Sequence, residues 1–294
     1  MREKRINRVY MMMIFPAFLG FIVLYIAPTI MSFLYSLTNW SVYNPNIKFV
    51  GLRNFIKIFT DEKLVAALWH SVKYAILITI IQNALAIIIA VLLNRKSKVT
   101  SFIKSITFLP AVLSIMVVGY LFQYIMTSAD GGLLNMIIEF FGGDSVNWLG
   151  DEKIALYSVL ITQVWQWTGW SMVIYIANLK SIDSTLYEAA DIDGASGLQK
   201  FFRVTLPLLY PGVSFNVLMS LIGGMKMFDA VFVMTKGGPG YATETIMTSL
   251  IREGFNSGRT AYACAFAVIF FVVVFAFSQG LTYFFNKWEG AIEG

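Results

Sequence analysis

The stretch "YEAADIDGASGLQKFFRVTLPLL" (residues 187–209) differs sharply from the chain around it, because it combines several acids with two glycines. Hydrophobic residues make up 57% of the sequence and charged residues only 13%. Ordinary globular chains have about 45 to 50% and about 25% of these two classes. A soluble domain of 294 residues would need a more highly charged exterior. The composition therefore predicts a membrane protein in which this polar stretch lies outside the bilayer.

The polar stretch and the residues just before it carry a dense set of helix-boundary signals. Thr185 and Glu188, three residues apart, form the pattern of a capping box, which begins a helix. Gly194 supplies the left-handed backbone conformation that commonly ends a helix. A second capping-box pattern spans residues 196–199, and Pro207 suits the first turn of the next helix. We therefore predict a helix, a tight turn and a second helix, followed by a membrane span.

Six segments are long and apolar enough to cross a bilayer, which takes about 20 mostly apolar residues. Polar or Gly-rich connections separate them. The predicted fold is therefore all-α and polytopic, with six transmembrane helices. They cover residues 10–37, 71–93, 102–126, 154–179, 208–234 and 261–285.

Lysine and arginine concentrate in the N-terminal "MREKRINR" and in the short loop "NRKSKVTSFIK" (94–104). Because these residues are enriched in cytoplasmic loops, we predict that both termini and the polar stretch face the cytoplasm. The expected organisation has three parts. They are an N-terminal arm with the first span and an outside loop (1–70), a core transmembrane domain with a cytoplasmic loop at 180–207 (71–285), and a cytoplasmic tail (286–294).

Part of the polar stretch, "EAADIDGASGLQKFFRVTLP", resembles the loop signature of permease subunits of binding-protein-dependent ABC importers. Val204 stands where that family prefers Ile. Further on, "FDAVFVMTKGGPGYATET" is similar to the segment that closes the fifth span in carbohydrate importers of the maltose and glycerol-phosphate permease type. The residues that match the loop signature at the right spacing are Glu188, Ala189, Ala190, Gly194, Leu206 and Pro207.

This resemblance implies a type I permease fold in a prokaryotic cytoplasmic membrane. It implies that the loop is a coupling helix seated in a groove of a separate ATPase. The expected partners are a second homologous permease, two ATPase subunits, an extracytoplasmic sugar-binding protein and the lipid bilayer, without nucleic acid. The chain has no G-x-x-x-x-G-K-[ST] phosphate-binding loop, so we expect a non-catalytic subunit without a cofactor.

The fourth predicted span, "ITQVWQWTGWSMVIYIANL", mixes amides with indoles, which suits carbohydrate binding but is also typical of an aromatic belt at the membrane interface. By the resemblance, Gln166, Trp167 and Trp170 match positions that line the sugar site of the maltose-type permease. Positions in the fifth span match as well, although the family has more Asn and aromatic residues there. These positions are Gly223, Gly224 and Met227.

Two charged residues, Lys226 and Asp229, lie three apart in the fifth predicted span, a spacing at which they would neutralise each other on one helix face. We predict mainly a structural pair and keep Asp229 as a candidate for the substrate pathway. His70 and Cys264 are each the only residue of their kind, so no metal site is expected.

Two other functions are consistent with six spans. An ion-gradient-driven secondary transporter or channel would need intramembrane acid or histidine relays, and the spans offer little beyond Lys226 and Asp229. An ABC importer for a non-sugar solute would share the loop signature. The sequence therefore favours the permease subunit of an ATP-driven sugar importer.

Overall fold

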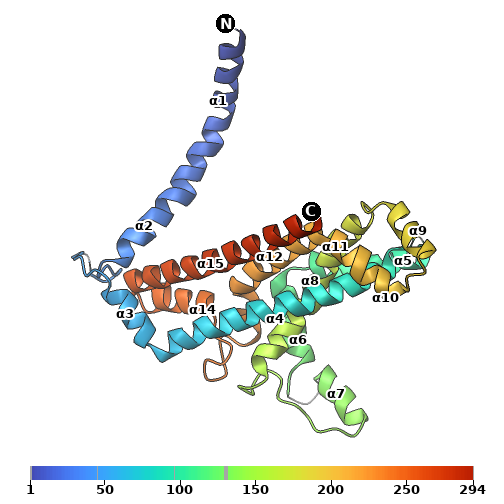
Figure 1. Cartoon of the computed structure of the whole chain (residues 1–294). Coiled ribbons are helices and arrows are strands. Elements are labelled where there is room, and N and C mark those ends of the chain that lie inside the picture. The colour runs from blue at the N-terminus through green and yellow to red at the C-terminus, as the bar shows by residue number, and fades with distance from the viewer. Residues whose placement is uncertain (1, 45, 96, 129–131, 294) are drawn as a thin grey trace. The chain divides into compact units, whose positions relative to one another are not determined.

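Helices account for nearly all of the regular structure in the computed structural model, which describes residues 2–44, 46–95, 97–128 and 132–293 (Figure 1). Within these residues the only β-pairing consists of two isolated bridges, Thr38 with Phe49 and Ser41 with Asn44. The all-α prediction is therefore confirmed. Lys96 of the predicted cytoplasmic loop, Met1 of the predicted arm and Gly294 of the predicted tail lie outside the described residues.

The helices follow one another along the chain with short connections. The first group comprises α1 (Arg2–Phe21), the π-helix η1 (Ile22–Ile26), α2 (Ala27–Ser36), α3 (Arg53–Thr60), α4 (Glu62–Leu93), α5 (Lys98–Val112), α6 (Ile115–Ile125), α7 (Leu133–Phe140) and α8 (Ala155–Leu179). The second comprises α9 (Ser184–Ile192), α10 (Gly197–Lys200), the π-helix η2 (Phe201–Thr205), α11 (Leu206–Leu208), α12 (Tyr210–Met225), α13 (Asp229–Met234), α14 (Ile246–Ile251), the π-helix η3 (Arg252–Asn256) and α15 (Thr260–Glu293).

Three continuous helical segments among the described residues are long and apolar enough to cross a membrane: Tyr10–Ser36, Glu62–Leu93 and Thr260–Trp288. Two bent pairs raise the number to five if each pair is one span. The pairs are Lys98–Val112 with Ile115–Ile125, bent by 100°, and Gly197–Leu208 with Tyr210–Met225, bent by 70°. α8 is 25 residues long but is not among these candidates. Its glutamines and tryptophans lower its apolar character.

The third and fifth predicted spans are therefore not single helices. α5 contains Pro110 and ends where Leu113 and Ser114 adopt extended backbone conformations (ψ 147° and 136°). Pro211 lies in the first turn of α12, just after the second bend. The helix is interrupted again after Met225, because Phe228 has a non-helical φ of −133° and ψ of −61°. Bends of this kind are tolerated in a membrane where neighbouring groups satisfy the freed backbone.

The chain divides into two compact units. One comprises Met1–Val65 and Leu250–Val272, and the other comprises Ala66–Ser249 and Val273–Gly294. In the second unit α5 packs directly on α8 at Gly169, where a side-chain carbon added to the glycine would collide with the Thr107 carbonyl oxygen. Only glycine allows the two helices to approach so closely.

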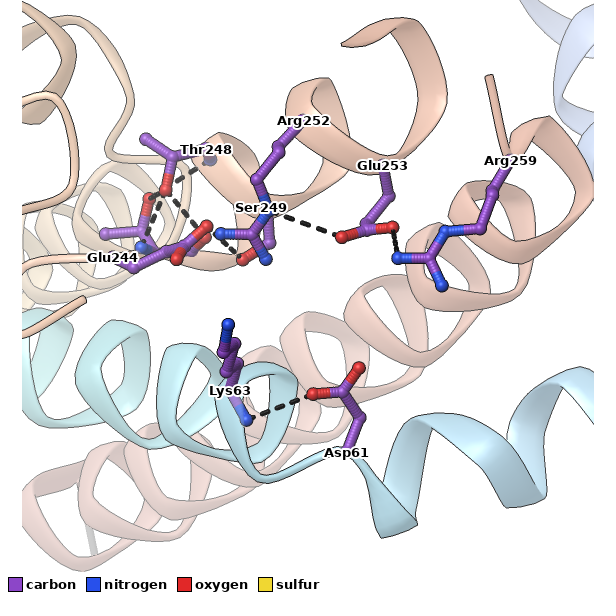
Figure 2. A network of polar contacts seen from close by, with 9 residues as sticks. Asp61, Lys63, Glu244, Thr248, Ser249, Arg252, Glu253 and Arg259 are labelled. Carbon is purple, nitrogen blue, oxygen red and sulfur yellow. Dashed lines mark hydrogen bonds and ion pairs between the residues drawn. The ribbon is translucent and has the colours of Figure 1, made fainter. Parts of the chain in front are cut away.

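In the first unit a buried carboxylate joins two arginines. Glu253 is only 4% exposed and forms ion pairs with Arg252, at 3.3 Å, and with Arg259 (Figure 2). The backbone N–H of Arg259 also donates to the Glu253 carbonyl, at 2.9 Å. These contacts tie η3 to the start of α15.

Candidate functional site

The polar loop forms the predicted helix, turn and helix. α9 ends at Ile192, and Gly194 has a φ of +71°, the left-handed conformation expected after a helix. The predicted first capping box is wrong, because the N-cap is Asp183 rather than Thr185. The Asp183 carboxylate accepts a 3.0 Å hydrogen bond from the Thr185 backbone N–H. This bond holds the pKa of Asp183 below its usual value.

The second predicted capping box is confirmed at the start of α10. The Ser196 backbone N–H donates to Gln199 Oε1 at 2.7 Å, and the Gln199 backbone N–H donates to Ser196 Oγ at 3.4 Å. Lys200 Nζ then pairs with Asp191 of α9 at 2.6 Å. Pro207 lies in the first turn of α11, as predicted. The two helices are thus held together as a single elbow around Gly194.

The elbow exposes much of its surface, apolar side chains included. Glu188, Ala189 and Gly194 of the loop signature are exposed. Ile192 and Leu198, on either side of the turn, are 88% and 70% exposed. Large apolar side chains exposed on either side of one turn are typical of a protein contact.

A cavity of about 290 Å³ lies within the second unit, between α4, α8 and α12 and the segment that follows α12. Its lining combines indoles, amides, hydroxyls and apolar groups with one cation and one carboxylate, a mixture suited to a polar organic ligand. Six of the seven predicted substrate-pathway residues line it. They are Trp167, Trp170, Gly223, Gly224, Met227 and Asp229.

Gln166, the seventh, does not line this cavity. It is fully buried, and its Nε2 donates a 3.0 Å hydrogen bond to the Leu113 carbonyl at the bend between α5 and α6. Its Oε1 accepts a 3.2 Å bond from Gln163, which does line the cavity. The Trp167 Nε1–H donates to Gln163 Oε1, also at 3.2 Å. Gln166 therefore does not line the cavity itself but holds Gln163, which does, through a hydrogen bond.

The two adjacent glycines of α12 have different surroundings. A side-chain carbon added at Gly223 would meet nothing within 4 Å, so this position opens onto the cavity. One added at Gly224 would lie 2.8 Å from both the Ala75 Cα and an Ile78 methyl group of α4. Gly224 thus sets the close approach of α12 to α4, and Gly223 leaves space.

The charged residues do not lie on one helix face. Lys226 is the C-cap of α12, whereas Asp229 begins α13, so the premise of a helical pair three residues apart is wrong. Both line the cavity, one on each side of the interruption. The break in the fifth predicted span therefore presents a cation and a carboxylate to the same space.

The segment with the "GGP" motif is tied to this break. The Thr245 hydroxyl donates to the Met227 carbonyl at 2.9 Å, and the Thr243 hydroxyl donates to the Gly238 carbonyl at 2.7 Å. Ser249 Oγ donates to a carboxylate oxygen of Glu244 at 2.9 Å (Figure 2). This loop thus fixes the non-helical residues at the edge of the cavity.

Several cavity residues were not predicted from the sequence, notably Gln82, Ser171, Asn216 and Ser220. Gln82 Nε2 donates to Ser171 Oγ at 2.8 Å and so joins α4 to α8. Asn216 Nδ2 approaches the Ser171 carbonyl at 3.4 Å and joins α12 to α8. Polar residues inside otherwise apolar predicted spans were the available signal. In the part of the chain that the structure describes, no group of three or more His, Cys, Asp or Glu side chains could hold a metal ion.

Comparison with known proteins shows which family this chain resembles. The family described as "Binding-protein-dependent transport system inner membrane component" matches residues 82–287. The arabinooligosaccharides transport system permease protein AraP of Halalkalibacterium halodurans is 34% identical over 270 residues, which cover 90% of this chain and 84% of that protein. The trehalose/maltose transport system permease protein MalF of Thermococcus litoralis is 30% identical over 267 residues, covering 91% and 90% of the two chains.

The crystal structure of a bacterial ABC transporter that imports the acidic polysaccharide alginate contains a chain of the same fold. The TM-score is 0.86 at 21% sequence identity, over 97% of this chain and 98% of that one. The expected resemblance to carbohydrate importer permeases is thus confirmed, and such a permease is a multi-pass, non-catalytic subunit of a transporter that depends on a binding protein. The chain belongs to the family of inner-membrane permeases of binding-protein-dependent ABC importers.

Proposed function

We propose that the chain is one of two homologous permease subunits of an importer for an oligosaccharide or related carbohydrate, driven by two separate ATPase subunits. The observation that carries the proposal is the cavity, in which Trp167 and Trp170 lie near the amides of Gln82 and Gln163. Indoles cover the apolar faces of sugar rings, and amides bond to hydroxyls. The relatives named for arabinooligosaccharides and for trehalose and maltose support this class of cargo.

The proposed topology has six spans with both termini in the cytoplasm. It counts the three continuous spans, the two bent pairs and α8. The 25 residues of α8 reach about 37 Å, enough to cross the hydrocarbon core. Its glutamines point into the protein rather than toward lipid, because Gln163 and Gln166 are both buried. The predicted parts 1–70, 71–285 and 286–294 follow from this topology.

The elbow around Gly194 is proposed to dock in a groove of the ATPase. The exposed Ile192 and Leu198 would enter the groove, and Glu188 would flank it. The Tyr187 hydroxyl lies 3.1 Å from the Thr205 hydroxyl, so α9 is connected to the residues that lead into α11 and Pro207. A displacement of the elbow would therefore be transmitted to the bent pair that contains α12.

The coupling role is tested by Gly194→Trp. An indole at this turn requires a left-handed backbone in a non-glycine residue and enlarges the surface that would dock. We expect normal membrane insertion, loss of the co-purifying ATPase and loss of ATP-driven uptake. Gly142→Trp is the matched control, because Gly142 is also exposed and also has a positive φ but lies outside the elbow. Normal uptake by Gly194→Trp, or uptake driven by an ion gradient without any ATPase, would contradict the proposal.

The cargo assignment is tested by Trp167→Ala in the reconstituted importer. Uptake of labelled maltose, trehalose and arabinooligosaccharides is measured in the presence of the cognate binding protein. We expect at least a tenfold loss for the transported sugar, since stacking of the indole on the sugar is removed. Trp165→Ala is the control, because Trp165 packs on Phe122, with ring centroids 5.2 Å apart, and does not line the cavity. Equal losses in the two variants would argue against sugar binding at Trp167.

A further inference from the structure

A second cavity, of about 920 Å³, lies in the second unit where the end of α4, the start of α5 and the end of α8 meet. Four of its seven lining residues are cations, and none of the seven is a carboxylate. We call it the basic cavity. Its lining consists of Asn94, Arg95, Ser97, Lys98, Ser101, Lys104 and Lys180.

Hydrogen bonds at the helix ends fix the backbone at and next to these cations. Ser97 is the N-cap of α5, and its hydroxyl accepts a 3.2 Å hydrogen bond from the Thr100 backbone N–H. The Thr100 hydroxyl donates to the Arg95 carbonyl at 2.8 Å. Lys180 is the C-cap of α8, and its backbone N–H donates to carbonyls of the last turn of α8. The N-terminal end of the 15-residue helix α5 adds its own positive potential to that of the side chains.

An apolar helix face continues from the basic cavity. On α5, Val99 and Phe102 are each 66% exposed, and Ile106 and Leu109 are 53% and 60% exposed. The opposite side of α5 packs on α8 at Gly169. The exposed face of α5 thus combines Lys98 at its start with large apolar side chains along the three turns that follow.

We propose that the basic cavity binds the phosphate group of an anionic phospholipid, whose acyl chains lie along the exposed face of α5. A cluster of cations at the cytoplasmic edge of the membrane attracts anionic head groups, at roughly 1 kcal/mol, or about fivefold in affinity, for each Lys or Arg. A free phosphate ion would use the cations but not the apolar face. The assignment of the lipid to the cytoplasmic leaflet rests on the topology proposed above. The basic cavity and the adjoining face of α5 are features of the structure and do not depend on that topology.

The test is lipid retention by the intact transporter complex. The complex is equilibrated with vesicles of phosphatidylcholine and phosphatidylglycerol in equal amounts, and its retained lipids are identified by native mass spectrometry. We expect the wild-type complex to retain phosphatidylglycerol in preference to phosphatidylcholine. We expect at least a tenfold loss of this preference in the test variant Arg95→Gln/Lys98→Gln/Lys104→Gln. The matched control removes one Arg and two Lys that are exposed elsewhere on the chain and should keep the preference; it is Lys48→Gln/Arg53→Gln/Lys153→Gln.

The alternatives give different results. Retained phosphatidylglycerol that inorganic phosphate displaces at equal concentration would overturn the lipid assignment in favour of a soluble anion. Loss of the ATPase from the test variant, with phosphatidylglycerol retained, would overturn it in favour of a protein contact. Equal lipid loss in the test and control variants would show only non-specific attraction and would also overturn it. ATP-driven sugar uptake is measured separately, so a failure of the proposed function is distinguishable from a failure of the lipid site.

Discussion

The side-chain amide of Gln166 on α8 donates a 3.0 Å hydrogen bond to the backbone carbonyl of Leu113, where α5 and α6 meet at 100°. Carbonyls at the end of a helix lose their intrahelical donors and need others. Because Gln163 in turn donates to Gln166, the bend is connected to a residue that lines the cavity. The shape of the bent span and the polarity of the cavity wall thus depend on one another.

Replacing Gln166 by Leu should destabilise the protein by about 1 to 3 kcal/mol, because the Leu113 carbonyl loses its donor and the buried amide of Gln163 loses its acceptor. The measurement is the thermal unfolding midpoint of the detergent-solubilised chain. Gln123→Leu is the control, since Gln123 lies on α6 and is exposed. Similar midpoints for the two variants would show that the contact with Leu113 contributes little.

The two glycines of α12 should respond in opposite ways to alanine. Gly223→Ala meets no neighbour and removes a flexible residue from a helix, so it should stabilise the fold by about 0.5 to 1 kcal/mol. Gly224→Ala should destabilise it by about 1 to 3 kcal/mol, because the new methyl group overlaps the Ala75 backbone of α4. The measurement is the thermal unfolding midpoint of each variant. A shift in the same direction for both would contradict the conclusion that Gly223 faces open space and Gly224 contacts α4.

Sugar uptake gives a second test of the space at Gly223. Gly223→Leu should reduce sugar uptake without lowering the thermal midpoint, because its side chain fills the cavity and touches no packed helix. Unchanged uptake by this variant would argue that the cargo does not pass Gly223.

The elbow around Gly194 was predictable from sequence because its determinants are local. Gly194 and the residues 196–199 act on the backbone within a few positions, and the structure has both features as predicted. The error at the start of α9 is also local. Asp183 and Thr185 are both suitable N-cap residues, and the carboxylate two residues earlier in the chain takes the role.

The bends and the cavity wall were less predictable, because their determinants are distant in sequence. Pro110 was visible as a feature of the third span, but the partner of Leu113 lies 53 residues away. Gln82 bonds to Ser171 across 89 residues. The resemblance to the family pointed to Trp167 and Trp170 on α8 and to Gly223 and Gly224 on α12. The other polar residues of the cavity required the packing of three helices to be known; they are Gln82, Ser171, Asn216 and Ser220.

The cap of α9 should depend on pH. The folded pKa of Asp183 is lowered, so its contribution is present above the unfolded pKa and is lost as the pH falls through the folded value. The protection factor of the Thr185 amide, which compares its exchange rate with the intrinsic rate at the same pH, should therefore be higher at neutral pH and fall upon acidification below the usual carboxyl range. Asp183→Asn is the control, because an amide oxygen accepts the same bond without titrating. The same pH dependence in Asp183→Asn would assign the effect to another group.

Because Glu253 forms ion pairs with two arginines, we expect substitutions of Glu253 and Arg259 to have non-additive effects on stability. Arg259→Leu leaves a buried carboxylate with Arg252 as its remaining ion-pair partner among the described residues, and should destabilise the protein by about 1 to 3 kcal/mol. Adding Glu253→Leu to this variant should restore part of the stability, since it removes the charge whose partner was lost. Thermal midpoints of both single variants and the double variant measure the coupling, with Arg53→Leu as the control for loss of an exposed arginine. Additive effects would show that the ion pair between Glu253 and Arg259 contributes nothing beyond the separate side chains.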